Sequence, residues 1–144
     1  ILYILITDKN VKINKIILQN MNKIQIFGFH TINSILIIFY LYPGSLLGFF
    51  IYNDSSVQPQ ITRDFLISSN HFYAFIILSI AGIVAYDKSN KINILIKYLV
   101  LLSILLELFH TIVPNRNFEL SDLFGNFLGV VFIFIFYKIK NKYA

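Results

Sequence analysis

The chain has 144 residues, of which 57% are hydrophobic and only 13% are charged, and its mean hydropathy is +0.71. Soluble domains average about 45–50% apolar and about 25% charged residues, so this composition excludes both an ordinary soluble domain and a disordered chain. The formal net charge is +5 and there is no cysteine. The missing thiols exclude disulfides, thiol catalysis and cysteine-ligated metals.

Four stretches are long and apolar enough to cross a membrane as helices. A hydrocarbon core about 30 Å thick needs roughly 20 apolar residues, and helices pair every backbone group within lipid. The candidate spans are residues 32–52, 65–86, 92–113 and 120–137. Because the connections between them are short, consecutive helices are expected to be antiparallel neighbours. The sequence therefore predicts an all-α, polytopic membrane protein with four antiparallel transmembrane helices.

The first residues of the chain have a different pattern. Residues 1–29 are predicted to form a cytoplasmic N-terminal segment, ahead of a four-helix domain at 30–137 and a basic cytoplasmic tail at 138–144. Residues 8–23 alternate lysine and asparagine with apolar residues, which is compatible with an interfacial helix. Met21 is the single methionine. The residues before it can therefore also be an upstream extension of the membrane domain.

Lysines and arginines fall on opposite sides of the four-span arrangement. The ten lysines precede the first span, lie around the connection between the second and third, or follow the fourth: Lys9, Lys12, Lys15, Lys23, Lys88, Lys91, Lys97, Lys138, Lys140 and Lys142. Arg63 and Arg116 lie on the other side. By the positive-inside rule, both termini are expected in the cytoplasm. The basic residues mark topology, so nucleic-acid binding is not expected.

The third span carries the most informative polar residues. Ser103, Glu107 and His110 are spaced i, i+4, i+7 and share one face of a helix. An ionisable group inside a bilayer is costly and is by default a functional hypothesis. Glu107 can instead be a structural residue that pairs with His110 or Arg116. Both interpretations place it near the outer end of the span.

The fourth span repeats the same spacing with Asp122, Asn126 and Gly129. The two polar faces are expected to meet near the outer surface, where His71 also lies, near the start of the second span. Asp122 can alternatively cap the start of its helix, and Asn126 can hydrogen-bond across to a neighbouring helix. Gly125 and Gly129 form a Gly-x-x-x-Gly spacing that favours close helix packing.

These residues resemble the VanZ-like family of membrane proteins over residues 30–137. The family pattern has Glu-x-x-Gln, a short loop with an arginine, and then aspartate, asparagine and glycine six, four and three residues apart. The matching positions here are Glu107, Arg116, Asp122, Asn126 and Gly129. The segment 71–75, His-Phe-Tyr-Ala-Phe, is similar to the family's His-Phe segment at the opening of its second helix.

The chain departs from the family pattern at three places. His110 stands where the family has glutamine, Ile67 and Ser68 replace an Asp-Lys pair, and Phe75 replaces a usual tyrosine. The resemblance implies a bacterial cytoplasmic membrane protein of the cell envelope. It also implies an association with resistance to teicoplanin, a lipid-tailed glycopeptide antibiotic.

Three functions compete on this evidence. The leading hypothesis is an outer-leaflet site in which Arg116 engages the anionic headgroup of an envelope lipid or a lipid-tailed glycopeptide. The proposed ligand-binding residues are Glu107, His110, Arg116, Asp122, Asn126 and His71. The alternatives are an accessory structural subunit of a membrane complex and a membrane-embedded enzyme that uses Glu107, His110 and Asp122. No cofactor and no metal is expected under the leading hypothesis.

Overall fold

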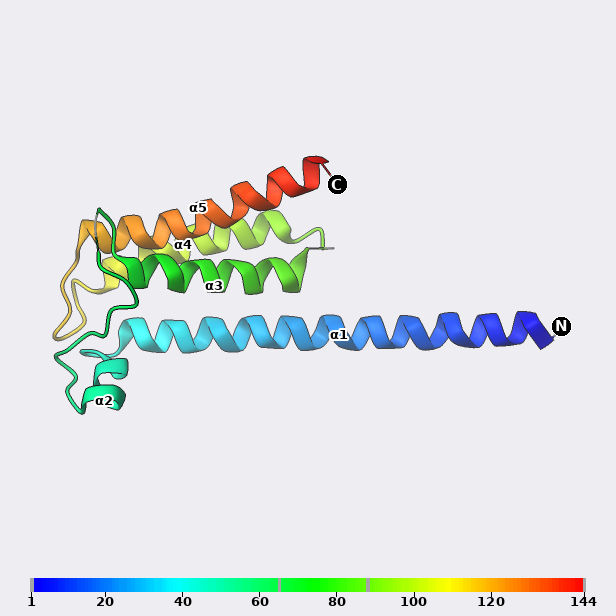
Figure 1. Cartoon of the computed structure of the whole chain (residues 1–144), viewed down its shortest axis with the longest axis horizontal. Coiled ribbons are helices and arrows are strands. Elements are labelled where there is room, and N and C mark those ends of the chain that lie inside the picture. Colours follow the sequence, from blue (N-terminus) through cyan, green and yellow to red (C-terminus); the bar gives the residue numbers. More distant parts are fainter. Residues whose placement is uncertain (1, 65, 88, 144) are drawn as a thin grey trace.

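The computed structural model describes residues 2–64, 66–87 and 89–143, with side chains described from residue 18 onward. This part of the chain contains α1 (Leu2–Leu41), α2 (Leu46–Tyr52), α3 (Ser69–Tyr86), α4 (Ile92–Phe109) and α5 (Leu120–Tyr143), and no strand (Figure 1). Four stretches are long and apolar enough to cross a membrane: Leu18–Leu41, Ser69–Tyr86, Ile92–Phe109 and Leu120–Tyr143. The predicted all-α, multi-pass membrane architecture is confirmed.

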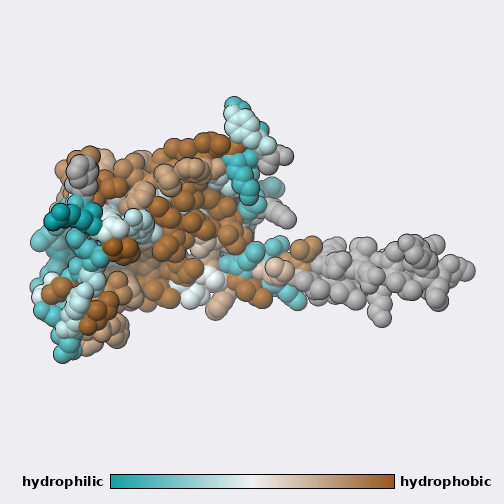
Figure 2. All heavy atoms as spheres, viewed as in Figure 1, coloured by the Kyte–Doolittle hydropathy of each residue, from teal (hydrophilic) through white to brown (hydrophobic). Residues whose placement is uncertain are grey.

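The surface of the bundle has the character of a membrane-facing surface. No more than a third of the residues in the most apolar stretch of each span are buried inside the protein. Phe27, Ile94 and Phe136 are 73%, 66% and 56% exposed. Figure 2 shows an apolar belt between polar surfaces at the two ends of the bundle. Exposed apolar area of this extent is stable only against lipid or another protein.

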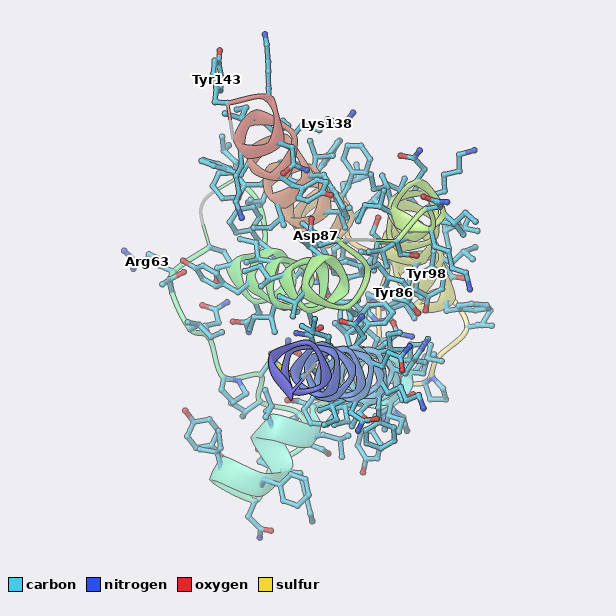
Figure 3. All side chains as sticks on the ribbon, turned by 90° about the vertical axis from the view of Figure 1, so that its right-hand side faces the viewer. Arg63, Tyr86, Asp87, Tyr98, Lys138 and Tyr143 are labelled. Atoms are coloured by element: carbon cyan, nitrogen blue, oxygen red, sulfur yellow. The ribbon has the colours of Figure 1, made fainter. Side chains whose placement is uncertain are left out.

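The helices alternate in direction, so the described chain ends lie at one end of the bundle and the longer loops at the other (Figure 1). We call the end that holds residues 42–64, 66–68 and 110–119 the loop end. Viewed along the helices, α3 lies between α1 and α5, with α4 to one side (Figure 3). The most extensive packing joins α3 and α5, which are parallel and not consecutive. Consecutive spans also contact one another and run antiparallel, as predicted.

The first span begins and ends earlier than the predicted residues 32–52. α1 is one continuous helix that ends at Leu41, and among the residues whose side chains are described its apolar stretch covers Leu18–Leu41. Pro43 has no N–H to continue the helix, and Gly44 has a φ of +95° that favours glycine. The remainder of the predicted span is the short helix α2. The predicted boundary at residue 29 lies within this continuous helix, and the division into an N-terminal segment and a membrane domain stays a prediction.

The other predicted spans agree with the structure more closely. α3 and α4 are shorter than the predicted ranges 65–86 and 92–113, and α5 continues through the lysines of the predicted tail. Phe65, the predicted start of the second span, and Lys88 lie outside the described residues. The side chains of Lys9, Lys12 and Lys15 also lie outside them.

Two glycines allow α5 to lie directly against α3. A Cβ atom on Gly125 would lie 2.7 Å from the Ser68 carbonyl oxygen, and one on Gly129 would lie 2.6 Å from the Phe72 carbonyl oxygen. Real Cβ contacts are not this short, so only glycine permits the observed separation. This close approach brings the first turns of α3 and α5 together, and with them His71 and Asn126.

Candidate functional site

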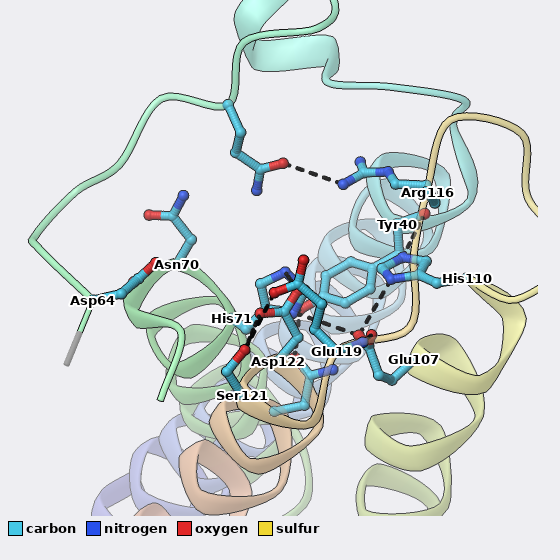
Figure 4. A network of polar contacts seen from close by, with 12 residues as sticks. Tyr40, Asp64, Asn70, His71, Glu107, His110, Arg116, Glu119, Ser121 and Asp122 are labelled. Carbon is cyan, nitrogen blue, oxygen red and sulfur yellow. Dashed lines mark hydrogen bonds and ion pairs between the residues drawn. The ribbon is translucent and has the colours of Figure 1, made fainter. Parts of the chain in front are cut away.

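A cluster of buried polar side chains lies between the helices at the loop end of the bundle (Figure 4). Each main helix contributes to it, and no member is more than 8% exposed: Tyr40 from α1, His71 from α3, Glu107 and His110 at the end of α4, and Asn126 from α5. Asp122, one turn before Asn126, borders the cluster with 18% of its side chain exposed. We call these six residues the polar cluster.

Hydrogen bonds at Asn126 fix the proton positions on its neighbours. The Asn126 amide nitrogen donates to the Ser103 carbonyl oxygen at 3.3 Å, so its Oδ1 atom faces the cluster as an acceptor. The Tyr40 hydroxyl donates to this Oδ1 at 2.6 Å, and His71 Nδ1 lies 3.1 Å from it. Because an amide oxygen only accepts, His71 carries a proton on Nδ1.

The other imidazole nitrogen of His71 faces a carboxylate. His71 Nε2 lies 3.2 Å from Asp122 Oδ2. In a neutral imidazole with its proton on Nδ1, Nε2 carries a lone pair, and so does an ionised carboxylate oxygen. Two such atoms in contact repel each other unless positive charge lies with them. The His71–Asp122 contact therefore needs either a second proton, on the imidazole or on the carboxyl group, or a metal ion between the two atoms.

Glu107 is fully buried and its two oxygens have different surroundings. Oε1 accepts a hydrogen bond of 3.0 Å from the Glu119 backbone N–H in the α4–α5 loop. Oε2 lies 3.3 Å from His110 Nδ1 and 3.9 Å from His71 Nδ1, but it has no hydrogen-bond partner among the described residues. Burying a carboxylate is costly without compensating charge. The two histidines are the groups placed to supply it.

Arg116 satisfies the end of α1 and makes no ion pair with the carboxylates among the described side chains. In a continuing helix, residue 43 would donate to the Phe39 carbonyl, but Pro43 has no N–H. Arg116 Nη2 donates to that carbonyl at 3.2 Å, and Nε donates to the Tyr42 carbonyl at 3.4 Å. Its positive charge also suits the negative end of the helix dipole.

His110 completes the same arrangement, because its Nε2 atom donates to the Tyr40 carbonyl oxygen at 3.1 Å. Arg116 and His110 thus donate hydrogen bonds to the carbonyl groups at the end of α1. They replace the backbone N–H groups that Pro43 and the following turn do not provide. Burial lowers the pKa of Arg116 from its ordinary value, but that value is so high that the guanidinium stays charged.

Replacing Arg116 with methionine is expected to lower the free energy of unfolding by about 2 kcal/mol, because two backbone carbonyls lose a charged donor. In a Pro43→Ala background the new N–H can donate to the Phe39 carbonyl. The loss should then be smaller by about 1 kcal/mol, as for coupled neighbours. Unfolding in mixed micelles with increasing SDS, followed by circular dichroism, measures the wild type, the two single variants and the double variant. Arg63→Met, at an exposed arginine, is the control, and equal losses in both backgrounds would contradict the capping role.

An apolar groove leads from the membrane-facing surface to the polar cluster. Its cavity volume is about 470 Å³, within the range of small-molecule sites. Its apolar walls come from α1, α2 and α3: Ile32, Ile35, Leu36, Phe39, Leu46, Leu47, Ile51, Ala74 and Ile77. Its polar end comes from Tyr40, His71, His110, Gln58 and Arg116. Ile35 and Ile77 on its walls remain 48% and 57% exposed.

A polar cavity lies on the other side of Arg116. It is lined by Gly44, Ser45, Ser55, Ser56, Gln58, Asn115 and Arg116, and its volume is about 380 Å³. The guanidinium therefore borders both an apolar groove and a polar cavity. One of its N–H groups is used by the Gln58 side chain at 3.2 Å (Figure 4).

The structure brings five of the six predicted site residues into the polar cluster and places the sixth beside it. Glu107, His110, His71, Asp122 and Asn126 lie in the cluster, whereas Arg116 lies above it in the loop region (Figure 4). Sequence reasoning missed Tyr40, which the predicted span 32–52 had placed in mid-membrane. The Pro-Gly pair that follows it, a typical helix terminator, was the signal that could have located Tyr40 at the loop end.

The comparisons with known proteins assign neither a family nor a function to this chain. No family model, curated protein or solved structure matches this chain. The VanZ-like resemblance therefore stays a prediction from the residues. Function has to be argued from the polar cluster, the groove and the charges around them.

Proposed function

We propose that this chain is a VanZ-like protein of the bacterial cytoplasmic membrane that binds an amphiphile at its loop end. The amphiphile is an envelope lipid or a lipid-tailed glycopeptide of the teicoplanin type. The loop end faces outward and both termini are cytoplasmic, in agreement with the positive-inside distribution of the charges.

One observation carries this proposal: Arg116 stands at the junction of an apolar groove and a polar cavity. An acyl tail fits the groove, whose walls are continuous with the membrane-facing surface. A phosphate or carboxylate group fits the polar cavity. A guanidinium has five N–H donors, and three are committed to Phe39, Tyr42 and Gln58, which leaves two for an anionic headgroup.

The tail-binding part of the proposal is tested by filling the groove. Ile77→Trp inserts an indole into its wall, whereas Ile80→Trp places the same group on the same helix outside the groove lining. Both isoleucines are about half exposed, at 57% and 47%. The two variants therefore differ in position and hardly in exposure.

The measurement is native mass spectrometry of protein reconstituted in vesicles of phosphatidylcholine and phosphatidylglycerol, with teicoplanin added in a second series. Wild type is expected to retain one of these amphiphiles after transfer into detergent. Ile77→Trp should lower its affinity about tenfold, which corresponds to about 1.4 kcal/mol. Ile80→Trp should retain as much as wild type. Equal retention by both variants, or none by wild type, would reject the groove as the binding site.

A further inference from the structure

We propose that His71, Glu107 and Asp122 form a binding site for a divalent first-row metal ion at the inner edge of the polar cluster. The site adjoins the amphiphile groove and shares His71 with it, whereas neither carboxylate lines that groove. It goes beyond the proposed function and does not depend on it.

The first support is the convergence of donor atoms from three different helices. One ligand atom of each of the three residues lies within 4.8 Å of the other two, and His71 Nε2 and Asp122 Oδ2 are 3.2 Å apart. Two ligands at about 2.0–2.1 Å from a tetrahedral ion are about 3.4 Å apart. The His71–Asp122 pair already has this separation, and the ligand atom of Glu107 lies within 4.8 Å of both.

The second support is the unpartnered oxygen of Glu107. Its side chain is 0% exposed, and Oε2 has no hydrogen-bond partner among the residues that the structure describes. Oε1 is held by the Glu119 backbone N–H, which fixes the direction of the free oxygen toward the cluster. Buried polar atoms in native proteins generally have a hydrogen-bond partner, so a buried carboxylate oxygen without a donor needs an explanation. Binding of a metal ion by this oxygen is such an explanation.

The third support is the arrangement of groups behind the ligands. His71 carries its proton on Nδ1 and directs it to Asn126 and Tyr40. The lone pair of Nε2, on the side of Asp122, is therefore available to a metal ion. Metal-bound histidines generally donate their other N–H to a fixed acceptor in this way. His110, 3.3 Å from Glu107 Oε2, is placed to orient that carboxylate.

The donor set indicates which ions the site takes. One imidazole and two carboxylates suit Zn²⁺ and Mn²⁺, whereas a softer ion would need sulfur ligands, and the chain has no cysteine. Three protein ligands leave at least one coordination position open. That position can hold a water molecule or an anionic oxygen.

The test measures metal on the purified full chain. Protein in detergent is stripped with a chelator, equilibrated with Zn²⁺ or Mn²⁺ alone, dialysed, and analysed by inductively coupled plasma mass spectrometry. Wild type is expected to hold about one equivalent of at least one of these ions. Uptake below about a tenth of an equivalent of both would overturn the proposal without any variant being made, and without reference to amphiphile binding.

Asp122→Asn is the main variant, because Asp122 is the least buried of the three and asparagine keeps its shape. Losing this ligand should weaken metal affinity at least about a hundredfold, since even outer partners of a ligand are worth 10–100-fold. Glu119→Gln, an exposed carboxylate three residues earlier, is the matched control and should bind as wild type does.

Co²⁺ loading gives a second readout, because its visible absorption reports the ligands directly. The spectrum of wild type should be lost in both Asp122→Asn and Glu107→Gln, and should persist in His30→Ala, an exposed histidine on α1. An unchanged spectrum or unchanged affinity in Asp122→Asn would show that any bound ion sits elsewhere.

Discussion

Replacing Glu107 with alanine is expected to lower the free energy of unfolding by about 3–5 kcal/mol, the cost of removing one partner from a buried ionic cluster. Glu107 is 0% exposed, and its removal leaves the Nδ1 atom of His110, only 2% exposed, without the carboxylate oxygen 3.3 Å away. The Glu119 backbone N–H would lose its acceptor as well. The mutation also opens a cavity in the closely packed end of the bundle.

SDS titration in mixed micelles measures this loss, with Glu119→Ala as the control. Glu119 is an exposed carboxylate whose side chain accepts one weak hydrogen bond from Ser121, so its loss should stay within about 0.5 kcal/mol. A chelator should be present throughout, so that bound metal does not contribute. If both variants unfolded at the same SDS fraction as wild type, Glu107 would not be the centre of the cluster.

Replacing Gly129 with leucine is expected to be about as damaging, with a loss of about 3 kcal/mol or more. A Cβ atom there would lie 2.6 Å from the Phe72 carbonyl oxygen, which belongs to the α3 backbone and cannot rotate away. The helices must then separate, and overpacking of this kind costs typically about 1–3 kcal/mol even where side chains can adjust. Separation would also pull Asn126 away from His71.

Gly28 offers the matched control on α1. A Cβ atom there has nothing within 4 Å among the described residues, so Gly28→Leu adds its Cβ atom in open space, unlike Gly129→Leu. Because leucine is the better helix former, this variant should gain up to about 1 kcal/mol. The two substitutions are therefore expected to change stability in opposite directions in the same SDS titration. A loss at Gly28 equal to that at Gly129 would mean that α3 and α5 do not pack as described.

The number and type of the spans could be predicted because they depend on local properties. Hydropathy over about 20 residues and the length of a helix across a bilayer do not require knowledge of neighbours. The error in the first span has a local cause as well. Apolar residues continue beyond Leu41 into α2, so hydropathy extended the predicted span to residue 52. Pro43 and Gly44, which typically end a helix, were not given enough weight.

The candidate site could be predicted only as a set of polar residues on one side of the membrane. The i, i+4, i+7 spacing correctly placed Glu107 and His110 on one helical face, and Asp122 and Asn126 on another. It could not predict that Arg116 would donate hydrogen bonds to the α1 carbonyl groups, or that Glu107 would lie beside the two histidines and not beside Arg116. That choice depends on which backbone groups Pro43 leaves without a donor, 73 residues earlier in the chain than Arg116.

The sequence by itself determined an all-α membrane protein, its four spans, and the segregation of lysines and arginines. These follow from composition and periodicity, which act along the chain. Only the tertiary structure decided that α3 and α5 would pack most closely and that Tyr40 would join the cluster. It also decided that His71 and Asp122 would meet at 3.2 Å. Such contacts depend on how far two backbones can approach, and that distance is set by the glycines of one helix against the carbonyls of another.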